Sequence, residues 1–167
     1  MRIAAVVTLA GLAGTLASGP VAAQSLFDRL SGAGGTGDPC FGRTYDREHL
    51  NRNPGQRVVA MHVVRERVEV AAENGPRRFT VRVGFRLRSG TETFSTLAIC
   101  TPAGDGAACA GEGDTGSFRL APAGQGLRMT IARLEVEGET ESSPDLARGD
   151  DRVFLLRPAA AAACSAS

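Results

Sequence analysis

The clearest pattern in this chain is an alternation of apolar and polar residues over residues 79–88. Successive side chains of a strand point to opposite faces, so a period of two predicts a strand with one buried and one solvated face. Residues 58–70 are rich in β-branched side chains and predict a strand before it. Residues 73–76, Glu-Asn-Gly-Pro, predict the hairpin turn that joins these two strands.

Further strands are predicted in the second half of the chain. They are expected over residues 91–100, around Phe118 and Leu120, over residues 127–136 and over residues 152–157. These segments are separated by glycine-rich or polar stretches, which are typical of turns.

The predicted strand over residues 127–136 changes parity halfway along its length. Its apolar residues share one face in the first half and the opposite face in the second: Leu127, Met129, Ile131, Leu134 and Val136. A bulge near Ala132 and Arg133 would turn both sets toward the core. In the last strand, Pro158 lacks an amide hydrogen and is predicted to end the strand.

Little helix is predicted. Thr44, followed by Asp46 and Glu48, is typical of a helix start, and residues 53–55, Asn-Pro-Gly, end this helix after about two turns. Residues 25–30 have the spacing of a single amphipathic turn.

Two segments are predicted to be loops. Residues 101–115 are rich in glycine, alanine and acidic residues and have no periodicity, so we expect a loop that carries Cys109. Residues 137–151 predict a second, acidic loop.

Several strands joined by short polar turns predict an all-β fold. We expect a small antiparallel β-barrel or sandwich of about six to eight strands over residues 40–158, with one short N-terminal helix and disulfide bracing. Residues 24–39 predict a flexible Gly-rich tether, and residues 159–167 an Ala-rich tail. A barrel of this size is filled by its own side chains, so binding is expected on loops or on the outer face. In shape it resembles small periplasmic inhibitors of lysozymes or proteases, a likeness of fold alone.

Residues 1–23 have the layout of a secretory signal peptide. Arg2 provides a positive start, residues 3–17 are apolar, and small residues at 21–23 precede Gln24. The apolar run is shorter than the ~20 residues that a membrane-spanning helix needs. We therefore expect cleavage before Gln24, export to the periplasm or the medium, and no transmembrane segment in the mature chain.

The four cysteines are expected to form structural disulfides, because disulfides persist outside the cytosol. Four cysteines allow three pairings. We favour Cys100 with Cys109, which bracket one predicted loop, and Cys40 with Cys164, which flank the first and last regular elements. A redox-active pair would need Cys-x-x-Cys spacing or a cationic surrounding, and the sequence indicates neither.

Composition narrows the classes of function. The absence of lysine excludes Schiff-base chemistry and a phosphate-loop lysine. Tryptophan is absent and tyrosine occurs once, so stacking platforms for sugars or single-stranded nucleic acid are scarce. Without the leader, the arginines and the acidic residues balance, so no nucleic-acid partner is expected.

We find no catalytic or cofactor motif and predict no cofactor. His49 and His62 are the only histidines of the chain. Neither stands in a Gly-x-Ser-x-Gly elbow or in a papain-like cysteine context. His49 is expected on the short helix and His62 half-buried in a strand.

Two acidic clusters have residue types that bind hard cations. They are Glu112 with Asp114, and Asp145 with Asp150 and Asp151. Their spacing matches no calcium-binding loop, so we interpret them as solvated loop residues and predict no metal site.

Arginines gather on the predicted solvent face of two neighbouring strands: Arg65, Arg67, Arg82, Arg86 and Arg88. Guanidinium groups arranged in this way can bind phosphate, carboxylate or an acidic protein surface. The alternative is a mixed-charge face, because Glu66, Glu69 and Glu92 are near enough in sequence to neutralise the arginines across the strands.

These features predict an exported, non-enzymatic binding or inhibitor-like module with an unknown protein or envelope component as its partner. Binding would use residues 101–115, residues 137–151 or the arginine face, since loops on a braced scaffold commonly carry function. Two alternatives stay open. One is a small secreted hydrolase that uses His49 or His62, and the other is a passive structural envelope protein.

Overall fold

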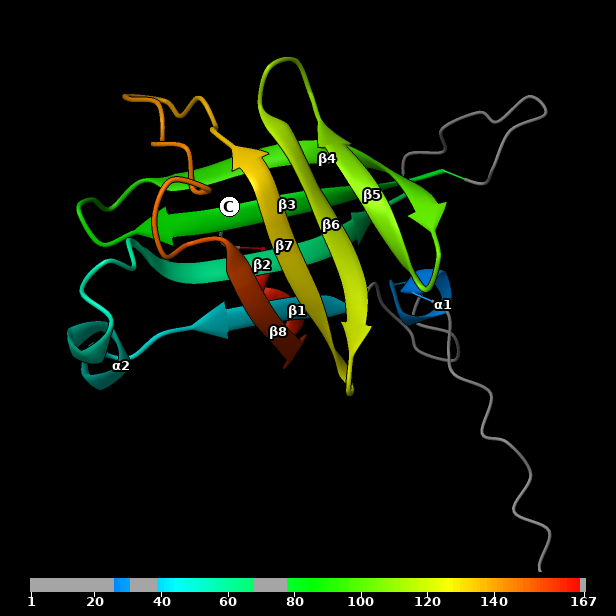
Figure 1. Cartoon of the computed structure of the whole chain (residues 1–167), viewed down its shortest axis with the longest axis horizontal. Helices are drawn as coiled ribbons and strands as arrows, with labels where there is room; N and C mark the ends of the chain where they lie inside the picture. Colours follow the sequence, from blue (N-terminus) through cyan, green and yellow to red (C-terminus); the bar gives the residue numbers. More distant parts are fainter. Residues whose placement is uncertain (1–25, 31–38, 68–77, 166–167) are drawn as a thin grey trace, which may run out of the picture.

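The computed structural model describes residues 26–30, 39–67 and 78–165, which form a closed barrel of eight antiparallel strands (Figure 1). Each strand pairs with its neighbours in sequence, and β1 pairs with β8 to close the barrel. The strands are β1 Cys40–Thr44, β2 Val58–Glu66, β3 Phe79–Leu87, β4 Thr93–Ala103, β5 Gly106–Gly111, β6 Gly116–Ala123, β7 Gly126–Leu134 and β8 Val153–Ala159. Within the described residues, three short helices accompany them: α1 Leu26–Leu30, α2 Arg47–Arg52 and the 3-10 helix η1 Ala161–Ala163. The predicted all-β barrel with a short helix is confirmed.

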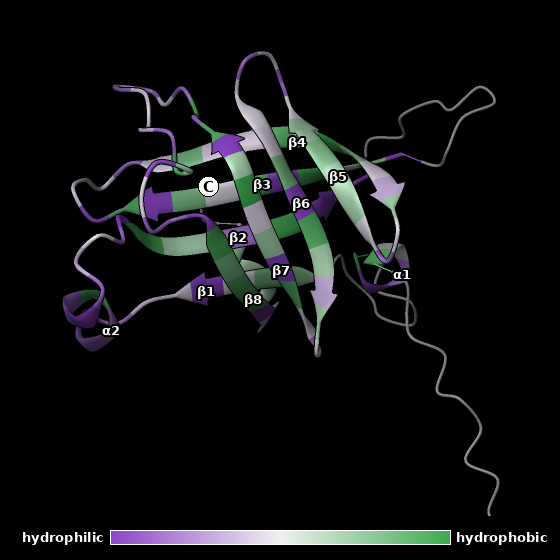
Figure 2. Ribbon diagram, viewed as in Figure 1, coloured by the Kyte–Doolittle hydropathy of each residue, from purple (hydrophilic) through white to green (hydrophobic). Residues whose placement is uncertain are grey.

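Alternation along the strands builds the core. On β3, Val81, Val83 and Phe85 are buried, and Figure 2 shows hydrophobic and hydrophilic bands alternating along the strands. Phe85 stacks on Phe94 of β4, with ring centroids 5.2 Å apart. The interior is filled by such side chains, as expected for a small barrel.

Helix α1 lies against β6 and contributes to the core. Leu26 and Leu30 are buried, which agrees with the predicted amphipathic turn. Arg29 of α1 donates to the carbonyl oxygens of Gly124 and Gly126, so α1 also holds the turn between β6 and β7. The predicted signal peptide and the predicted hairpin turn over residues 73–76 lie outside the described residues.

The prediction of a loop over residues 101–115 is wrong. β4 continues to Ala103, and β5 follows after a tight turn. Large apolar residues are missing from β5, whose buried side chains are those of Ala107 and Cys109. Small residues give no recognisable period of two in hydrophobicity, so the sequence pattern does not predict β5 as a strand.

Two predictions about strand irregularities can be compared with the structure, the bulge in β7 and the end of β8. The predicted bulge is confirmed, because Phe118 pairs with Ile131 and Ser117 with Arg133, so that Ala132 is the extra residue. Pro158, however, does not end β8, which continues to Ala159. β7 pairs with β8 only as far as Leu156, so Pro158 lies where β8 has a ladder partner on one side alone.

Both predicted disulfides are confirmed. Cys100 and Cys109 are directly opposite each other on β4 and β5, with their Cα atoms 4.0 Å apart. Cys40 of β1 bonds to Cys164, which directly follows η1. This second disulfide fixes the end of the described chain against the first strand, and both are typical of a protein outside the cytosol.

Candidate functional site

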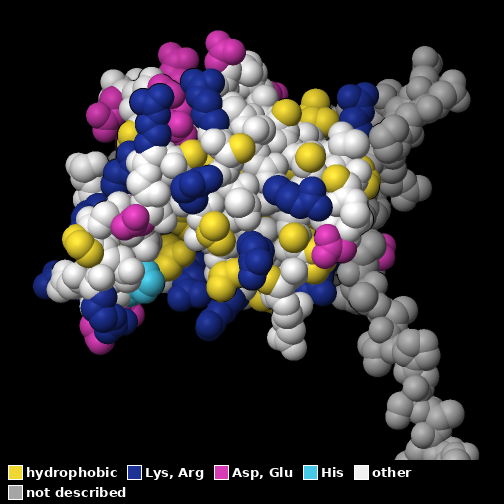
Figure 3. Space-filling view, viewed as in Figure 1, with side chains coloured by type: hydrophobic (Ala, Val, Ile, Leu, Met, Phe, Trp, Pro, Cys, Tyr) yellow, Lys and Arg dark blue, Asp and Glu magenta, His cyan; other side chains and the backbone are white. Residues whose placement is uncertain are grey.

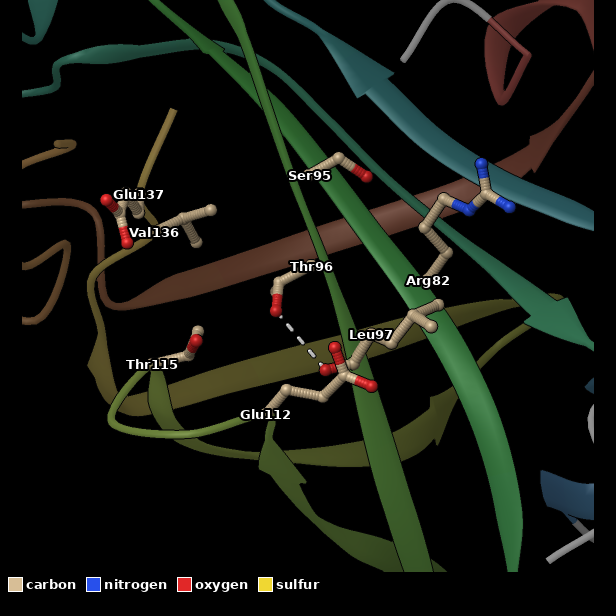
Figure 4. A pocket seen from close by; sticks show the side chains of 8 residues that line it. All are labelled: Arg82, Ser95, Thr96, Leu97, Glu112, Thr115, Val136 and Glu137. Atoms are coloured by element: carbon tan, nitrogen blue, oxygen red, sulfur yellow. Dashed lines mark hydrogen bonds between the residues drawn. The ribbon is translucent and has the colours of Figure 1, made fainter. Parts of the chain in front are cut away.

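A notch opens at the end of the barrel where β4 extends beyond β5. The last residue pair between these strands is Ala98 with Gly111, so residues 93–97 of β4 continue without β5 beside them. The notch has a volume of 350 Å³ and lies between β4, the β5–β6 turn and the chain that follows β7 (Figure 4). Its lining residues are Arg82, Ser95, Thr96, Leu97, Glu112, Thr115, Val136 and Glu137.

The lining side chains divide into two groups across β4. Figure 4 shows the side chains of Thr96, Thr115 and Glu137 on one side of this strand and those of Arg82 and Ser95 on the other. The lining is therefore polar, with carboxylates and hydroxyls on the side that faces the chain after β7.

Main-chain hydrogen bonds fix the turn between β5 and β6. The amide of Glu112 donates to the carbonyl oxygen of Leu97 at 3.1 Å, and the amide of Thr115 donates to that of Glu112 at 3.2 Å. The carbonyl oxygen of Thr115 accepts from the amide of Glu135 at 2.9 Å. This turn is thus tied to β4 on one side and to the chain after β7 on the other.

The opposite wall of the notch is held by the segment over residues 137–151. Ser143 is buried, and its hydroxyl accepts from the Val136 amide at 2.9 Å. Asp145 accepts from the amides of Leu134 and Ala147 at 3.1 and 3.0 Å. The acidic segment is therefore bonded back onto β7 and the residues that follow it.

The pKa of Asp145 reflects this bonding. Burial would raise the pKa, but the two amide hydrogen bonds and the charges of Arg148 and Arg133 outweigh burial and lower the pKa below its usual value. The carboxylate is therefore stabilised in its ionised form.

Glu92, on the turn between β3 and β4, holds the tip of the same segment. Its carboxylate accepts from the Thr140 hydroxyl at 2.6 Å and from the amides of Glu139 and Thr140. The Thr140 hydroxyl is the main cause of a lowered Glu92 pKa. Desolvation, the next largest effect, opposes it, and the two amides add to the lowering. Glu92 therefore does not neutralise the arginine face.

The predicted arginine face is divided by the strand register. Arg82 is paired with Val64, whereas Arg65 is paired with the fully buried Val81. Residues opposite each other in a ladder share a face, so Arg65 lies on the inward parity and Arg82 on the outward parity. Arg67 directly follows the end of β2 and is exposed.

The outward arginines have different surroundings. Arg82 forms an ion pair with Glu66, as the cross-strand alternative predicted. Arg88 donates to the Leu50 carbonyl oxygen at 2.7 Å, and Arg86 is exposed. Of the five predicted arginines, Arg82 alone lines the notch.

His49 lies on α2, whose N-terminus is capped by Asp46. Its Nε2 atom is 2.9 Å from the Gln56 side-chain oxygen, and its ring stacks on Tyr45 with centroids 4.6 Å apart. An amide carries no charge to stabilise an imidazolium, so this arrangement lacks the carboxylate partner typical of a catalytic histidine.

His62 lies on β2 opposite Gly84, and 6% of its surface is exposed. A Cβ atom on Gly84 would lie 2.2 Å from His62 Nε2, so the imidazole ring occupies the space above this glycine. Burial, followed by the charge of Arg82, lowers the pKa of His62. His62 is thus kept neutral on the outward parity of the sheet.

In the acidic cluster of Asp145, Asp150 and Asp151, two carboxylates have structural partners instead of convergent geometry. Asp151 is fully buried and accepts hydrogen bonds from Val58 of β2 and from Arg57 before it, Asp145 accepts from amides in and near β7, and Asp150 is exposed. In the part of the chain that the structure describes, no group of three or more histidine, cysteine, aspartate or glutamate side chains could hold a metal ion.

Thr96 is the notch residue that the sequence could have indicated. It stands between Phe94 and Ala98, which are both buried, so it lies on the inward parity of β4. A polar residue in the buried series near a strand end is a signal that the barrel is open there. Val136 and Glu137 line the notch only because of tertiary contacts, so no pattern in the sequence could have indicated them.

Comparison with protein families, with curated proteins and with solved structures finds no match for this chain. Over the described ranges, none of the helices is long and apolar enough to cross a membrane. The functional interpretation therefore depends on the geometry of the barrel.

Proposed function

We propose that this protein is an exported, periplasmic or secreted, non-enzymatic binding module whose notch receives a basic group of a partner protein. The observation that carries the proposal is that the chain segments lining the notch contribute two carboxylates to it, those of Glu112 and Glu137. Among the described residues, neither side chain has an ion pair or a hydrogen bond. Carboxylates in a concave site are suitable partners for a lysine or arginine side chain.

The rigid frame of the notch supports a binding function. Main-chain bonds hold the β5–β6 turn, and Ser143 and Asp145 hold the opposite wall. Preorganised walls lose little conformational entropy when a partner binds, which favours affinity. An inhibitor-like contact, in which a side chain of the partner enters the notch, suits this geometry.

The surroundings of the two histidines favour binding over the hydrolase alternative. His49 contacts an amide and an aromatic ring, and His62 is buried beside Arg82. Neither histidine lines the notch. His49→Gln and His62→Gln, assayed separately at neutral pH, should therefore leave partner capture unchanged, whereas a hydrolase that uses one of them would lose its activity.

Photo-crosslinking tests the proposal. A photoreactive phenylalanine analogue at Thr115, which lines the notch and leaves both carboxylates in place, should give one discrete crosslinked product with the proteins of an exporting host. The same analogue at Ala108, an exposed residue on β5, is the control and should give no such product. Equal labelling from both positions, or none from Thr115, would contradict the notch as a binding site and favour a passive envelope protein.

A further inference from the structure

A second surface, at the opposite end of the barrel, has the opposite charge. Consecutive hairpin turns of a meander lie at opposite ends, so the β6–β7 turn is remote from the β5–β6 turn of the notch (Figure 1). Next to the β6–β7 turn is a groove of 570 Å³ that shares no lining residue with the notch. Its walls are residues 123–128, residues 155–158 of β8, and Arg43 of β1.

Exposed apolar side chains lie in and beside this groove. Leu155 is 47% exposed and lines the groove, and Val153, two residues earlier on the same outward parity, is 53% exposed. Phe154 and Leu156, between and after them, are buried, so β8 is apolar on both faces. An exposed apolar patch rimmed by polar groups is typical of a contact surface.

Three arginines surround the apolar residues. Arg128 is directly opposite Leu155 in the β7–β8 ladder, Arg157 is opposite Gly42, and Arg43 completes the groove. None of these arginines has a carboxylate partner within the described ranges, and the groove has no acidic lining residue. Figure 3 shows basic and hydrophobic side chains intermingled over β7 and β8, while acidic side chains gather toward the segment after β7.

Helix α1 and close packing against β8 fix the β6–β7 turn, which forms one wall of the groove. Arg29 of α1 donates to the carbonyl oxygens of Gly124 and Gly126. A Cβ atom on Gly126 would lie 2.0 Å from the Leu156 carbonyl oxygen, so glycine allows the turn to pack closely against β8. The groove is therefore preformed.

We propose that this groove binds an acidic peptide segment of a partner protein, in which an apolar side chain stands between carboxylates. The apolar side chain would lie on Leu155, and the carboxylates would pair with Arg128 and Arg157. Guanidinium groups pair with carboxylates in bidentate geometry, and arginine beside apolar residues is a common composition of protein interfaces. The groove is concave, which suits a peptide chain better than the flat surface of a lipid bilayer.

Fluorescence anisotropy with a defined probe tests this proposal. The probe is a labelled peptide with one leucine between two pairs of glutamates, and its control has glutamines in place of the glutamates. The wild-type protein should bind the acidic peptide, with an affinity that falls as salt is added, and should bind the glutamine peptide at least about tenfold more weakly.

Charge-reversal variants locate the binding surface. Arg128→Glu/Arg157→Glu should weaken binding by about 10- to 100-fold, which corresponds to the loss of hydrogen bonds between charged groups. The matched control Arg47→Glu/Arg86→Glu makes the same charge change at two exposed arginines outside the groove and should bind like the wild type. Leu155→Ser retains the arginines and should also weaken binding.

Four results would overturn the proposal. They are no binding of the acidic peptide, equal losses in the two arginine variants, binding to phosphatidylglycerol vesicles but not to the peptide, and self-association of the chain through the groove. Because the peptide assay does not involve the notch, its failure would leave the proposed function of the notch unaffected. Failure of the crosslinking test at the notch would likewise leave the groove proposal unaffected.

Discussion

The buried carboxylate of Asp151 accepts hydrogen bonds from both the main-chain amide and the side-chain Nε of Arg57, at 2.9 and 3.2 Å. It also accepts from the amide of Val58 at 3.1 Å. Arg57 in turn donates to the carbonyl oxygens of Asp145 and Arg148. The start of β2 and the segment that forms one wall of the notch are therefore joined through one ion pair.

Removing this carboxylate should destabilise the whole barrel. Asp151→Ala leaves three donors without their acceptor, one of them buried and two partly buried, so we expect the free energy of unfolding to fall by about 3 kcal/mol. The neighbouring Asp150 is exposed, and Asp150→Ala should change it by less than about 0.5 kcal/mol. Urea unfolding of both variants measures the difference, and equal effects would contradict the structural role of Asp151.

The two disulfides should differ in their contribution to stability. Cys40 and Cys164 close a loop with a sequence separation of 124, and Cys100 and Cys109 close one with a separation of 9. Chain entropy assigns about 5 kcal/mol to the first and about 2.6 kcal/mol to the second. All four residues are buried, so losses of packing are similar when each pair is changed to alanine. Chemical denaturation should show the larger loss for Cys40→Ala/Cys164→Ala, and the opposite order would contradict this account.

His62 should make stability depend on pH near neutrality. Because the pKa of His62 is lower in the folded protein than its usual 6.5, the unfolded chain binds a proton first as pH falls. Its contribution is therefore complete above about pH 6.5 and is lost below it, with a slope of at most about 1.4 kcal/mol per pH unit. His62→Gln cannot titrate and should flatten the stability profile between about pH 7 and 5. Identical profiles for variant and wild type would show that His62 does not cause the dependence.

Glu92 should control the tip of the segment after β7. Glu92→Ala removes the acceptor of the Glu139 and Thr140 amides, so hydrogen exchange at both amides should become faster. Glu135, an exposed residue whose carboxylate contacts Arg133, provides the control as Glu135→Ala. If Glu92→Ala left exchange at Glu139 and Thr140 unchanged, the tip would be held by other contacts.

The sequence predicted the barrel well because its strong signals are local. The alternation on β3, the parity change on β7 and the turn residues all depend on neighbouring positions in the chain. β5 was not predicted because alanine, glycine and cysteine occupy its buried side and give no hydrophobic alternation. The strand end at Pro158 was predicted wrongly because a proline is tolerated in a strand where one neighbouring strand is missing. Both features depend on how the strands pair in the folded protein, and not on neighbouring residues in the chain.

The candidate sites were less predictable than the fold. The expected arginine face placed Arg65 and Arg82 together, but pairing register puts them on opposite faces, and a shift of one residue in register decides this. The groove does have a local signal in the sequence. Val153 and Leu155 of β8 are apolar residues on the parity that faces solvent, where polar residues are expected. The walls of the notch come from segments far apart in sequence, so no local pattern could bring them together.

The most direct test of the central claim is capture of the partner by immobilised protein carrying reversed charges in the notch. Glu112→Arg/Glu137→Arg should abolish capture of the partner that the wild type retains. Glu139→Arg/Glu141→Arg makes the same charge change at two exposed residues that do not line the notch, and should capture the partner as the wild type does. Capture that survives in the notch variant, or that is lost equally in both, would contradict the proposal that the notch is the binding site.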